Sequence, residues 1–423
     1  MKAIPRIMPT LPAADLFNIF RNLSRDIPEE DAQKIVSGFE TKFAERYGLP
    51  RGVATSRARM ALYYLLKNMG LKPNGEVLIS AIHVADFINI IALAGFKPVV
   101  VDLAHNSYNV DCDDLERKIT KNSVLFLMTY LSGYVPDMER IVEISQKYKL
   151  PFIEDCSQAL DSYYKGQRLG TFGVAAIFSL SLFKSVTTLF GGMLISRNET
   201  LLSDIRQDVK SLKPPPKQLL VNEAIKNVVL KIVISNPLFS AVVFPLMRWT
   251  LPVADYFSKY QKSNKQVFLR DKIPDEFLVQ YTWQQAITGL SQLKTLDKRE
   301  RKRKENALYL YDNIVSDRNV AVPALVKDSE NSFWLFPVIV NSPNEFRAFL
   351  AKTAIDSSKF LLSLLCEEKV FSHFKFNSDN ARELKQKTVF VPMYSVLSKA
   401  QTERIAQAIK KYQAINGSNN DNR

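Results

Sequence analysis

Residues 151–193 combine a lysine, a carboxylate and hydroxyl side chains at spacings that could serve one reaction. An apolar run ends in Glu154 and Asp155, which is typical of a buried strand that delivers its last side chain to the edge of a sheet. A second apolar run ends at Ser179, and Lys184 follows five residues later. Ligands of open α/β sheets bind at the carboxyl ends of the strands, so these side chains are expected to meet there.

Lys184 is a candidate nucleophile because of its surroundings. Most lysines are solvated surface charges, and the residue type alone would not indicate catalysis. Here Phe178, Leu180 and Phe183 lie close to it in the sequence. Desolvation by such neighbours lowers the pKa of a lysine and frees its amine to attack a carbonyl group.

The same stretch resembles a known family. The matching residues are Asp155-Cys-Ser-Gln158, Lys165-Gly166, Gly170-Thr-Phe-Gly173, Phe178-Ser179, Lys184 and Gly191-Gly-Met193. Together they resemble the core of the DegT/DnrJ/EryC1/StrS family, sugar aminotransferases that use pyridoxal 5'-phosphate (PLP) and have the fold of type I aminotransferases.

The resemblance implies a role for each site residue. Lys184 would hold PLP covalently and move protons during catalysis, and Asp155 would pair with the nitrogen of the cofactor ring. Gln158 would lie beside the ring, and Ser179 would bind the cofactor phosphate. These types suit the chemistry, because an anionic carboxylate keeps the ring nitrogen protonated and makes the ring an electron sink. No metal site is expected.

A second phosphate-binding element is expected near residue 58. A short strand at residues 53–54 leads into a helix over residues 57–68, and such a step points backbone amides at an anion. The family usually has Ser-Gly-Thr here, and this chain has Arg57, Ala58 and Arg59. The resemblance therefore implies that Ala58 and Arg59 bind the phosphate, with Arg59 contributing charge in place of a hydroxyl.

The chain departs from the family pattern at three further places. Val84, beside His83, stands where the family has an aromatic ring that stacks on PLP. Leu278 and Gln280 stand where the family has an Asn-x-Arg that reaches the partner subunit's cofactor phosphate. Phe190 replaces the glutamate of a Gly-Glu-Gly-Gly segment. Either His83 supplies the stacking face, or an aliphatic contact replaces it.

Strands that alternate with helices predict an α/β fold, with a mostly parallel sheet sandwiched by helices and a smaller C-terminal α+β domain. We expect a large PLP-binding domain over residues 1–200 and an insertion over residues 201–275. The small domain would follow over residues 276–415, with a disordered polar tail at 416–423. The helix that enters the small domain is expected at 277–296.

Composition and charge indicate which kinds of partner the protein binds. The chain has 423 residues and a net charge of +14, and its three cysteines form neither a disulfide framework nor a zinc spacing. Without a visible signal peptide, a cytoplasmic location is expected. No nucleic-acid-binding module is visible, and the basic run at 298–304 is typical of a solvated helix face. Surplus positive charge suits the diphosphate of a nucleotide sugar.

Residues 224–256 are unusually apolar, with no charge between 232 and 247. A membrane span needs about 20 apolar residues, and Pro237 and Pro245 interrupt this run. Flanking basic residues suit a segment that lies in a membrane interface at the inner face of the membrane. A hydrophobic subdomain packed on the main domain, or across a dimer interface, explains the composition equally well.

The leading hypothesis is a PLP-dependent aminotransferase that transfers an amino group from glutamate to a nucleotide-linked keto sugar in the biosynthesis of a polysaccharide or surface glycan. The enzyme would act as a homodimer. A sugar dehydratase of the same family would carry histidine in place of Lys184. A third hypothesis, a non-catalytic scaffold at the membrane, is favoured by the three departures and opposed by the retained Asp155 and Lys184.

Overall fold

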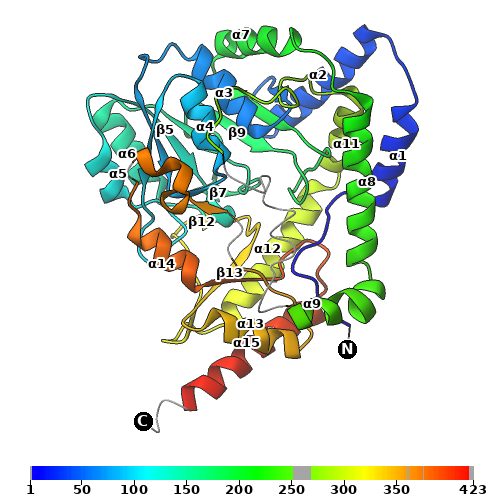
Figure 1. Ribbon diagram of the computed structural model, residues 1–423, viewed down its shortest axis with the longest axis vertical. Helices are drawn as coiled ribbons and strands as arrows, with labels where there is room; N and C mark the ends of the chain where they lie inside the picture. The colour runs from blue at the N-terminus through cyan, green and yellow to red at the C-terminus, as the bar shows by residue number, and fades with distance from the viewer. Residues whose placement is uncertain (1, 251–267, 360–361, 375, 419–423) are drawn as a thin grey trace.

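The computed structural model describes residues 2–250, 268–359, 362–374 and 376–418. A central sheet with helices on both faces forms one end of the molecule, and a smaller sheet with its own helices forms the other. Helix α12 (Leu296–Asn313) runs from the first region to the second (Figure 1). The predicted combination of a mostly parallel α/β sheet and a smaller C-terminal α+β region is confirmed.

The central sheet has seven strands, of which the five from β9 to β4 are parallel. In spatial order they are β1 (Val53–Thr55), β10 (Gly192–Ser196), β9 (Ala175–Ser179), β6 (Phe152–Asp155), β5 (Ser123–Thr129), β2 (Glu76–Ser80) and β4 (Lys97–Val101). Strand β10 runs antiparallel to both β9 and β1. The parallel strands β6 and β9 therefore end at the same edge, which brings Asp155 and Ser179 to one end of the sheet.

Alternate residues of each strand face opposite layers, as the period of two requires. In β5, Leu125 and Leu127 join one hydrophobic core while Phe126 and Met128 join the other. The first core includes α3 (Ala58–Asn68), α4 (Asp86–Leu93) and α7 (Glu199–Lys210). The second includes α2 (Glu29–Glu45), α5 (Cys112–Lys118) and α6 (Met138–Tyr148). Burial on both faces explains why these strands are nearly continuous apolar runs.

The small domain is built on an antiparallel sheet of β11 (Val320–Ala321), β13 (Phe336–Val340) and β15 (Thr388–Val391). Its helices are α13 (Pro343–Lys352), α14 (Asp379–Lys387) and α15 (Lys399–Ser418). Helix α15 extends into the segment predicted to be disordered, where Asn416 donates a hydrogen bond to the Tyr412 carbonyl. Residues 416–418 are therefore helical, and the rest of the predicted tail lies outside the described residues.

The helix that leads into the small domain, α11 (Trp283–Leu293), is shorter than the predicted 277–296. Thr282 caps it, because its hydroxyl accepts from the Gln285 amide while the Gln285 side chain accepts from the Thr282 amide. This reciprocal capping box satisfies two backbone groups at the helix start and fixes the boundary. Residues 277–282 are consequently not part of the helix.

Gly289 and Gly38 offer a matched test of packing between α11 and α2. A Cβ at Gly289 would lie 2.4 Å from the ring of Phe39, whereas nothing lies within 4 Å of one at Gly38. We expect Gly289→Ala to destabilise the protein by about 1–3 kcal/mol through overpacking. Gly38→Ala should stabilise it by about 0.5–1 kcal/mol, because alanine favours the helix. Thermal unfolding checks both, and a destabilised Gly38→Ala would contradict this account of the interface.

The apolar segment forms α8 (Lys217–Ile234), a π-helical turn at Phe239–Val243 and α9 (Phe244–Thr250). One side of α8 packs on α1 (Ala13–Leu23) through Leu220 and Ala224. The opposite side exposes Ile225, Val229 and Ile232 by 47%, 53% and 54%. Figure 1 shows α8 beside α1.

In the described part of the chain, no single helix has the length and composition of a membrane span. The pair formed by residues 217–234 and 239–248 meets these two criteria together, but it is bent by 70° at the break. Residues 251–256, the last part of the apolar segment predicted from the sequence, lie outside the described residues.

Candidate active site

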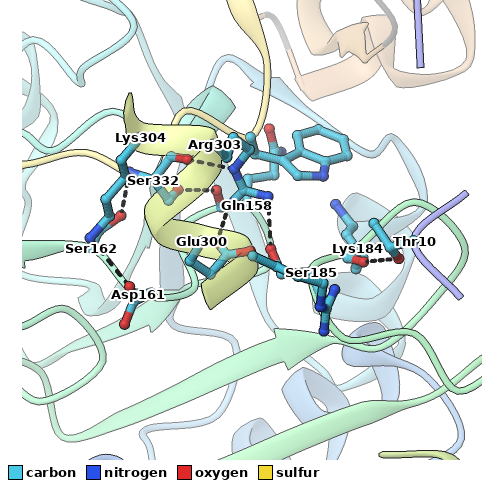
Figure 2. A network of polar contacts seen from close by, with 12 residues as sticks. Thr10, Gln158, Asp161, Ser162, Lys184, Ser185, Glu300, Arg303, Lys304 and Ser332 are labelled. Atoms are coloured by element: carbon cyan, nitrogen blue, oxygen red, sulfur yellow. Dashed lines mark hydrogen bonds and ion pairs between the residues drawn. The ribbon is translucent and has the colours of Figure 1, made fainter. Parts of the chain in front are cut away.

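Lys184 lies in the loop between β9 and β10, and this loop is held from two directions. The hydroxyl of Thr10, in the N-terminal segment, donates a hydrogen bond of 2.7 Å to the Lys184 carbonyl (Figure 2). The indole nitrogen of Trp334, in the small domain, donates to the Phe183 carbonyl at 2.9 Å. Phe183 has a positive φ of 69°, so the chain turns sharply just before the lysine. These contacts fix where the Lys184 side chain starts.

The Lys184 amine faces a largely apolar environment. Its Nζ lies 3.7 Å from the centre of the Trp334 ring. Burial lowers its pKa from 10.5 to about 8, although the charge of Asp155 acts in the opposite direction. The surrounding pocket is lined by Cys156, Ser157, Gln158, Leu160, Phe178, Ser179, Leu180, Lys184, Ser185, Val186 and Trp334. Three of the predicted site residues, Gln158, Ser179 and Lys184, thus share one pocket.

The lowered pKa predicts how the lysine reacts with an aldehyde. Only the neutral amine attacks a carbonyl group, and its fraction rises as the pH rises through the pKa. We expect the rate at which Lys184 combines with pyridoxal to rise with pH, with a midpoint near pH 8, and to level off above it. Absorbance traces over a pH series measure this rate. A midpoint near 10.5, the value of a solvated lysine, would contradict the account.

The two adjacent carboxylates of β6 have different functions in the structure. Glu154 is fully buried and accepts hydrogen bonds from the amides of Gly170, Phe172 and Gly173 and from the Tyr130 hydroxyl. It therefore fixes the turn at 170–173. Asp155 points to the other side of the strand, toward the site.

Asp155 is held as an anion by its surroundings. Burial alone would raise its pKa, but contacts with His83 and Ser157 lower it, and the net pKa lies below the usual value. The Ser157 amide donates to Oδ1 at 2.9 Å, and Nε2 of His83 lies 3.2 Å from Oδ2. A buried carboxylate that stays ionised is suited to pair with a cationic ring nitrogen.

His83 lies against Asp155. Its Nδ1 accepts the amide of Val84 at 2.9 Å, which leaves Nε2 to carry the proton toward Asp155. The ring also contacts Phe87, with centroids 4.1 Å apart. The structure thus shows the edge of the His83 ring directed at the carboxylate, a contact that nothing in the local sequence pattern indicates.

A buried polar network ties the pocket to the small domain (Figure 2). The Gln158 side-chain oxygen accepts the Ser132 amide at 2.8 Å, and the Gln158 carbonyl accepts the Ser332 hydroxyl at 3.0 Å. Arg303 donates to the Ser332 carbonyl and to the Ser185 hydroxyl next to Lys184. Glu300 forms an ion pair with Arg303, and both are buried.

This network corrects the interpretation of the basic run at 298–304 as a solvated helix face. Arg299 and Glu300, with Arg303 one turn further on, occupy the inner face of α12 and hold the loop that carries Lys184. Lys298 and Arg301 of the same run are exposed. Composition alone could not separate the two faces, because buried charges of opposite sign look like any other charged residues in a sequence.

The predicted phosphate-binding residues lie around Gly192. Ser179 and Thr55 pair with Gly192 on either side in the sheet, so the three residues face the same way. A Cβ at Gly192 would lie 2.6 Å from the Ala58 nitrogen, so the start of α3 lies directly over this glycine. No side chain caps α3, and its first two residues are Ala58 and Arg59. The Ser179 hydroxyl and these helix amides therefore border the same space.

The Arg59 side chain is engaged elsewhere. Its guanidinium forms an ion pair with Asp86 at 2.5 Å, and Arg270 contacts the other oxygen of Asp86 at 2.6 Å. The two residues at the place of the family's Asn-x-Arg have contacts within this chain: Leu278 packs in the first core, and the side-chain amide of Gln280 donates to the Lys210 and Leu212 carbonyls. The arginine that the sequence predicted as a source of charge for the phosphate thus shares its charge with a buried carboxylate.

The residues present fit PLP by their chemistry. The desolvated amine suits the aldehyde of this cofactor, and the ionised buried carboxylate suits its ring nitrogen. The uncapped helix start beside a serine hydroxyl suits its phosphate. Among the described residues, no group of three or more histidine, cysteine and acidic side chains is placed to hold a metal ion.

The fold is that of the PLP-dependent sugar aminotransferases, and the cofactor of these enzymes is PLP. The family model of the DegT/DnrJ/EryC1/StrS aminotransferase family matches residues 31–214 and 280–410, and the chain belongs to this family. The match leaves out residues 215–279, which include α8 and α9.

Relatives with assigned names act on sugars. The chain is 34% identical over 166 residues to GDP-perosamine synthase of Escherichia coli O157:H7. The aligned region covers 39% of this chain and 46% of that enzyme. The chain thus matches about half the length of that enzyme. It is 24% identical over 378 residues to dTDP-3-amino-3,6-dideoxy-alpha-D-galactopyranose transaminase of Aneurinibacillus thermoaerophilus, covering 89% and 90% of the two chains.

Solved structures share the fold. AtS13 from Actinomadura melliaura superimposes with a TM-score of 0.75 at 19% identity, over 97% of this chain and 99% of that one. The Helicobacter pylori aminotransferase PseC, described as involved in the biosynthesis of pseudoaminic acid, superimposes with a TM-score of 0.73 at 19% identity. The match covers 97% of this chain and 99% of that one.

Proposed function

We propose that this protein transfers an amino group from an amino acid to a keto sugar carried on a nucleotide, in the biosynthesis of a polysaccharide or surface glycan. The observation that carries the proposal is the Lys184 amine, enclosed beside Trp334 with a pKa near 8 and under the influence of the Asp155 charge. The names of the relatives support the substrate class, because they include GDP-linked and dTDP-linked sugars.

Glutamate is the proposed amino donor. A relative in Shewanella sediminis, 31% identical over 168 residues, is named an oxoglutarate aminotransferase, and oxoglutarate is what glutamate becomes when it gives up its amine. We further propose a cytoplasmic homodimer, which size-exclusion chromatography with light scattering tests directly.

The protein's own residues provide positioning and proton transfer. PLP, when bound, supplies the electron sink. Lys184 Nζ would hold the cofactor, and it would accept and return the proton at the reacting carbon. Asp155 would keep the ring nitrogen protonated, while His83 and the Ser157 amide hold that carboxylate in place. Trp334 and the apolar lining exclude water from the amine.

Two half-reactions test the proposal. Glutamate added to the PLP-loaded protein should remove the absorbance of the lysine-linked cofactor and release oxoglutarate. Keto sugars linked to guanosine, thymidine or uridine diphosphate should then restore the absorbance, and the sugar that does so identifies the substrate. A protein that takes up no PLP, or that takes it up and does not react with any amino donor, would instead favour the scaffold hypothesis.

The exposed face of α8 supports a second proposal, contact with a membrane surface. Between residues 224 and 250 there are three basic residues and no acidic one. Exposed apolar side chains with basic neighbours suit an anionic lipid surface. Val229→Glu should reduce co-sedimentation with vesicles that contain phosphatidylglycerol, whereas Val315→Glu, at a site 76% exposed, should not. Conversion of a dimer to a monomer by Val229→Glu alone would show that the face is a subunit interface instead.

A further inference from the structure

Two positions at which the chain departs from its family's pattern are in contact with each other. Arg57 stands at the place of the serine in Ser-Gly-Thr, and Phe190 at the place of the glutamate in Gly-Glu-Gly-Gly. The Cζ of Arg57 lies 4.3 Å from the centre of the Phe190 ring. A planar guanidinium stacks well on an aromatic face, so the phenylalanine holds the arginine side chain in place. A glutamate at position 190 would instead neutralise it.

Arg57 has no carboxylate in direct contact with it. In the part of the chain that the structure describes, its guanidinium forms no ion pair, and Nη1 donates to the neighbouring Ser56 carbonyl at 2.8 Å. Burial, together with the nearby charge of Arg59, lowers its pKa to about 10, although the charges of Glu223 and Glu276 act in the opposite direction. Arg59 and Arg270, in contrast, share the carboxylate of Asp86. An enclosed cation without an anion in direct contact is costly unless a ligand supplies one.

The surroundings of Arg57 indicate what that ligand is. Arg57 is the residue that precedes α3, so the free amides of the helix start adjoin its backbone. Gly192 lies against the same backbone, with the position of its missing Cβ 2.5 Å from the Arg57 carbonyl carbon. The Ser179 hydroxyl faces the same side of the sheet as Gly192. Helix amides, a hydroxyl and a guanidinium together are the groups that bind a phosphate.

We propose that Arg57 binds a phosphate group at the start of α3, held there by Phe190. This inference rests on the proposed function. The family pattern has an Asn-x-Arg from the partner subunit where this chain has Leu278 and Gln280. We assign the positive charge of that missing arginine to Arg57 of the same chain. The phosphate comes either from the cofactor or from the diphosphate of the nucleotide sugar. Arg57 and Phe190 then depart from the family pattern together, because the phenylalanine holds the arginine that binds the phosphate.

Binding measurements with matched probes test this site. PLP and pyridoxal differ by the phosphate alone, and inorganic phosphate and nucleoside diphosphates supply phosphate without the ring. We expect Arg57→Met to weaken PLP binding by about 10- to 100-fold, the range of one charge-assisted hydrogen bond, and to leave pyridoxal binding unchanged. Arg57→Lys should weaken PLP binding less than Arg57→Met does, because lysine keeps the positive charge. Arg197→Met removes an exposed arginine at the end of β10 and serves as the control.

Phe190→Glu is a second variant that does not depend on how well Arg57→Met folds. It keeps the arginine and should lower phosphate affinity by placing a carboxylate beside it. Loss of nucleoside diphosphate binding to the PLP-loaded protein, with unchanged PLP affinity, would assign the site to the substrate. If PLP, inorganic phosphate and nucleoside diphosphates all bind both variants as tightly as the Arg197→Met control, the inference is overturned. These readouts are independent of turnover, so a protein that binds PLP but fails to transaminate would contradict only the proposed function.

Discussion

Lys184→Ala should abolish transamination and prevent the formation of any lysine-linked cofactor absorbance. The lysine is both the covalent anchor and the proton-transfer group, and general acid–base catalysis alone contributes about 10²- to 10⁴-fold. We therefore expect turnover to fall on the order of 10³-fold or more. Steady-state kinetics with glutamate and spectra of the PLP-loaded protein measure the two effects.

The control for Lys184→Ala is Lys165→Ala, which removes a lysine from the same stretch of sequence. Lys165 is exposed and forms an ion pair with Glu139 on the surface. Its loss should leave both spectrum and turnover unchanged, because exposed ion pairs contribute about 0–1 kcal/mol. Lys184→Ala should also fold normally, since its removal relieves the burial of a cation. Retained absorbance in Lys184→Ala would show that another residue anchors the cofactor.

Asp155→Asn should reduce turnover by about 10²- to 10³-fold, the effect of removing one preorganised charged or polar group from a catalytic site. The amide cannot hold the ring nitrogen in its protonated form, so the cofactor would bind but would be a poorer electron sink. The variant should keep its PLP absorbance and its thermal stability while kcat falls. Kinetics, spectra and a melting curve of the same preparation separate these outcomes.

Glu154→Gln provides the contrasting case one residue away. Glu154 accepts three backbone amides, and an amide group in its place leaves some of them without an acceptor, at a cost of about 1–3 kcal/mol. We expect its melting temperature to fall while turnover per folded molecule is largely kept. A pattern in which Glu154→Gln loses turnover and Asp155→Asn loses only stability would reverse the roles that the structure indicates for the two acids.

Much of the large domain could be predicted because its determinants are local. Buried parallel strands are continuous apolar runs, and the ends of β6 and β9 follow from where those runs stop. Asp155, Gln158, Ser179 and Lys184 could be selected because they follow such strands within a span of 30 residues.

What the sequence could not predict depends on contacts between distant segments. Trp334 lies 150 residues from Lys184 in the chain, and nothing in its local pattern connects the two. The buried pair of Glu300 and Arg303 resembles surface charge until the packing of α12 is known. The start of α11 differs from the expected residue 277, because the capping box of Thr282 and Gln285 begins the helix at Trp283. His83 and Arg57 likewise acquire their contacts only through folding.

The most direct test of the central claim is to locate the cofactor on the chain. The PLP-loaded protein is reduced with borohydride, digested and analysed by peptide mass spectrometry. We predict that the added mass of the reduced cofactor lies on Lys184 alone. Its presence on another lysine, or its absence from every peptide after PLP loading, would contradict the assignment of Lys184 as the residue that carries PLP.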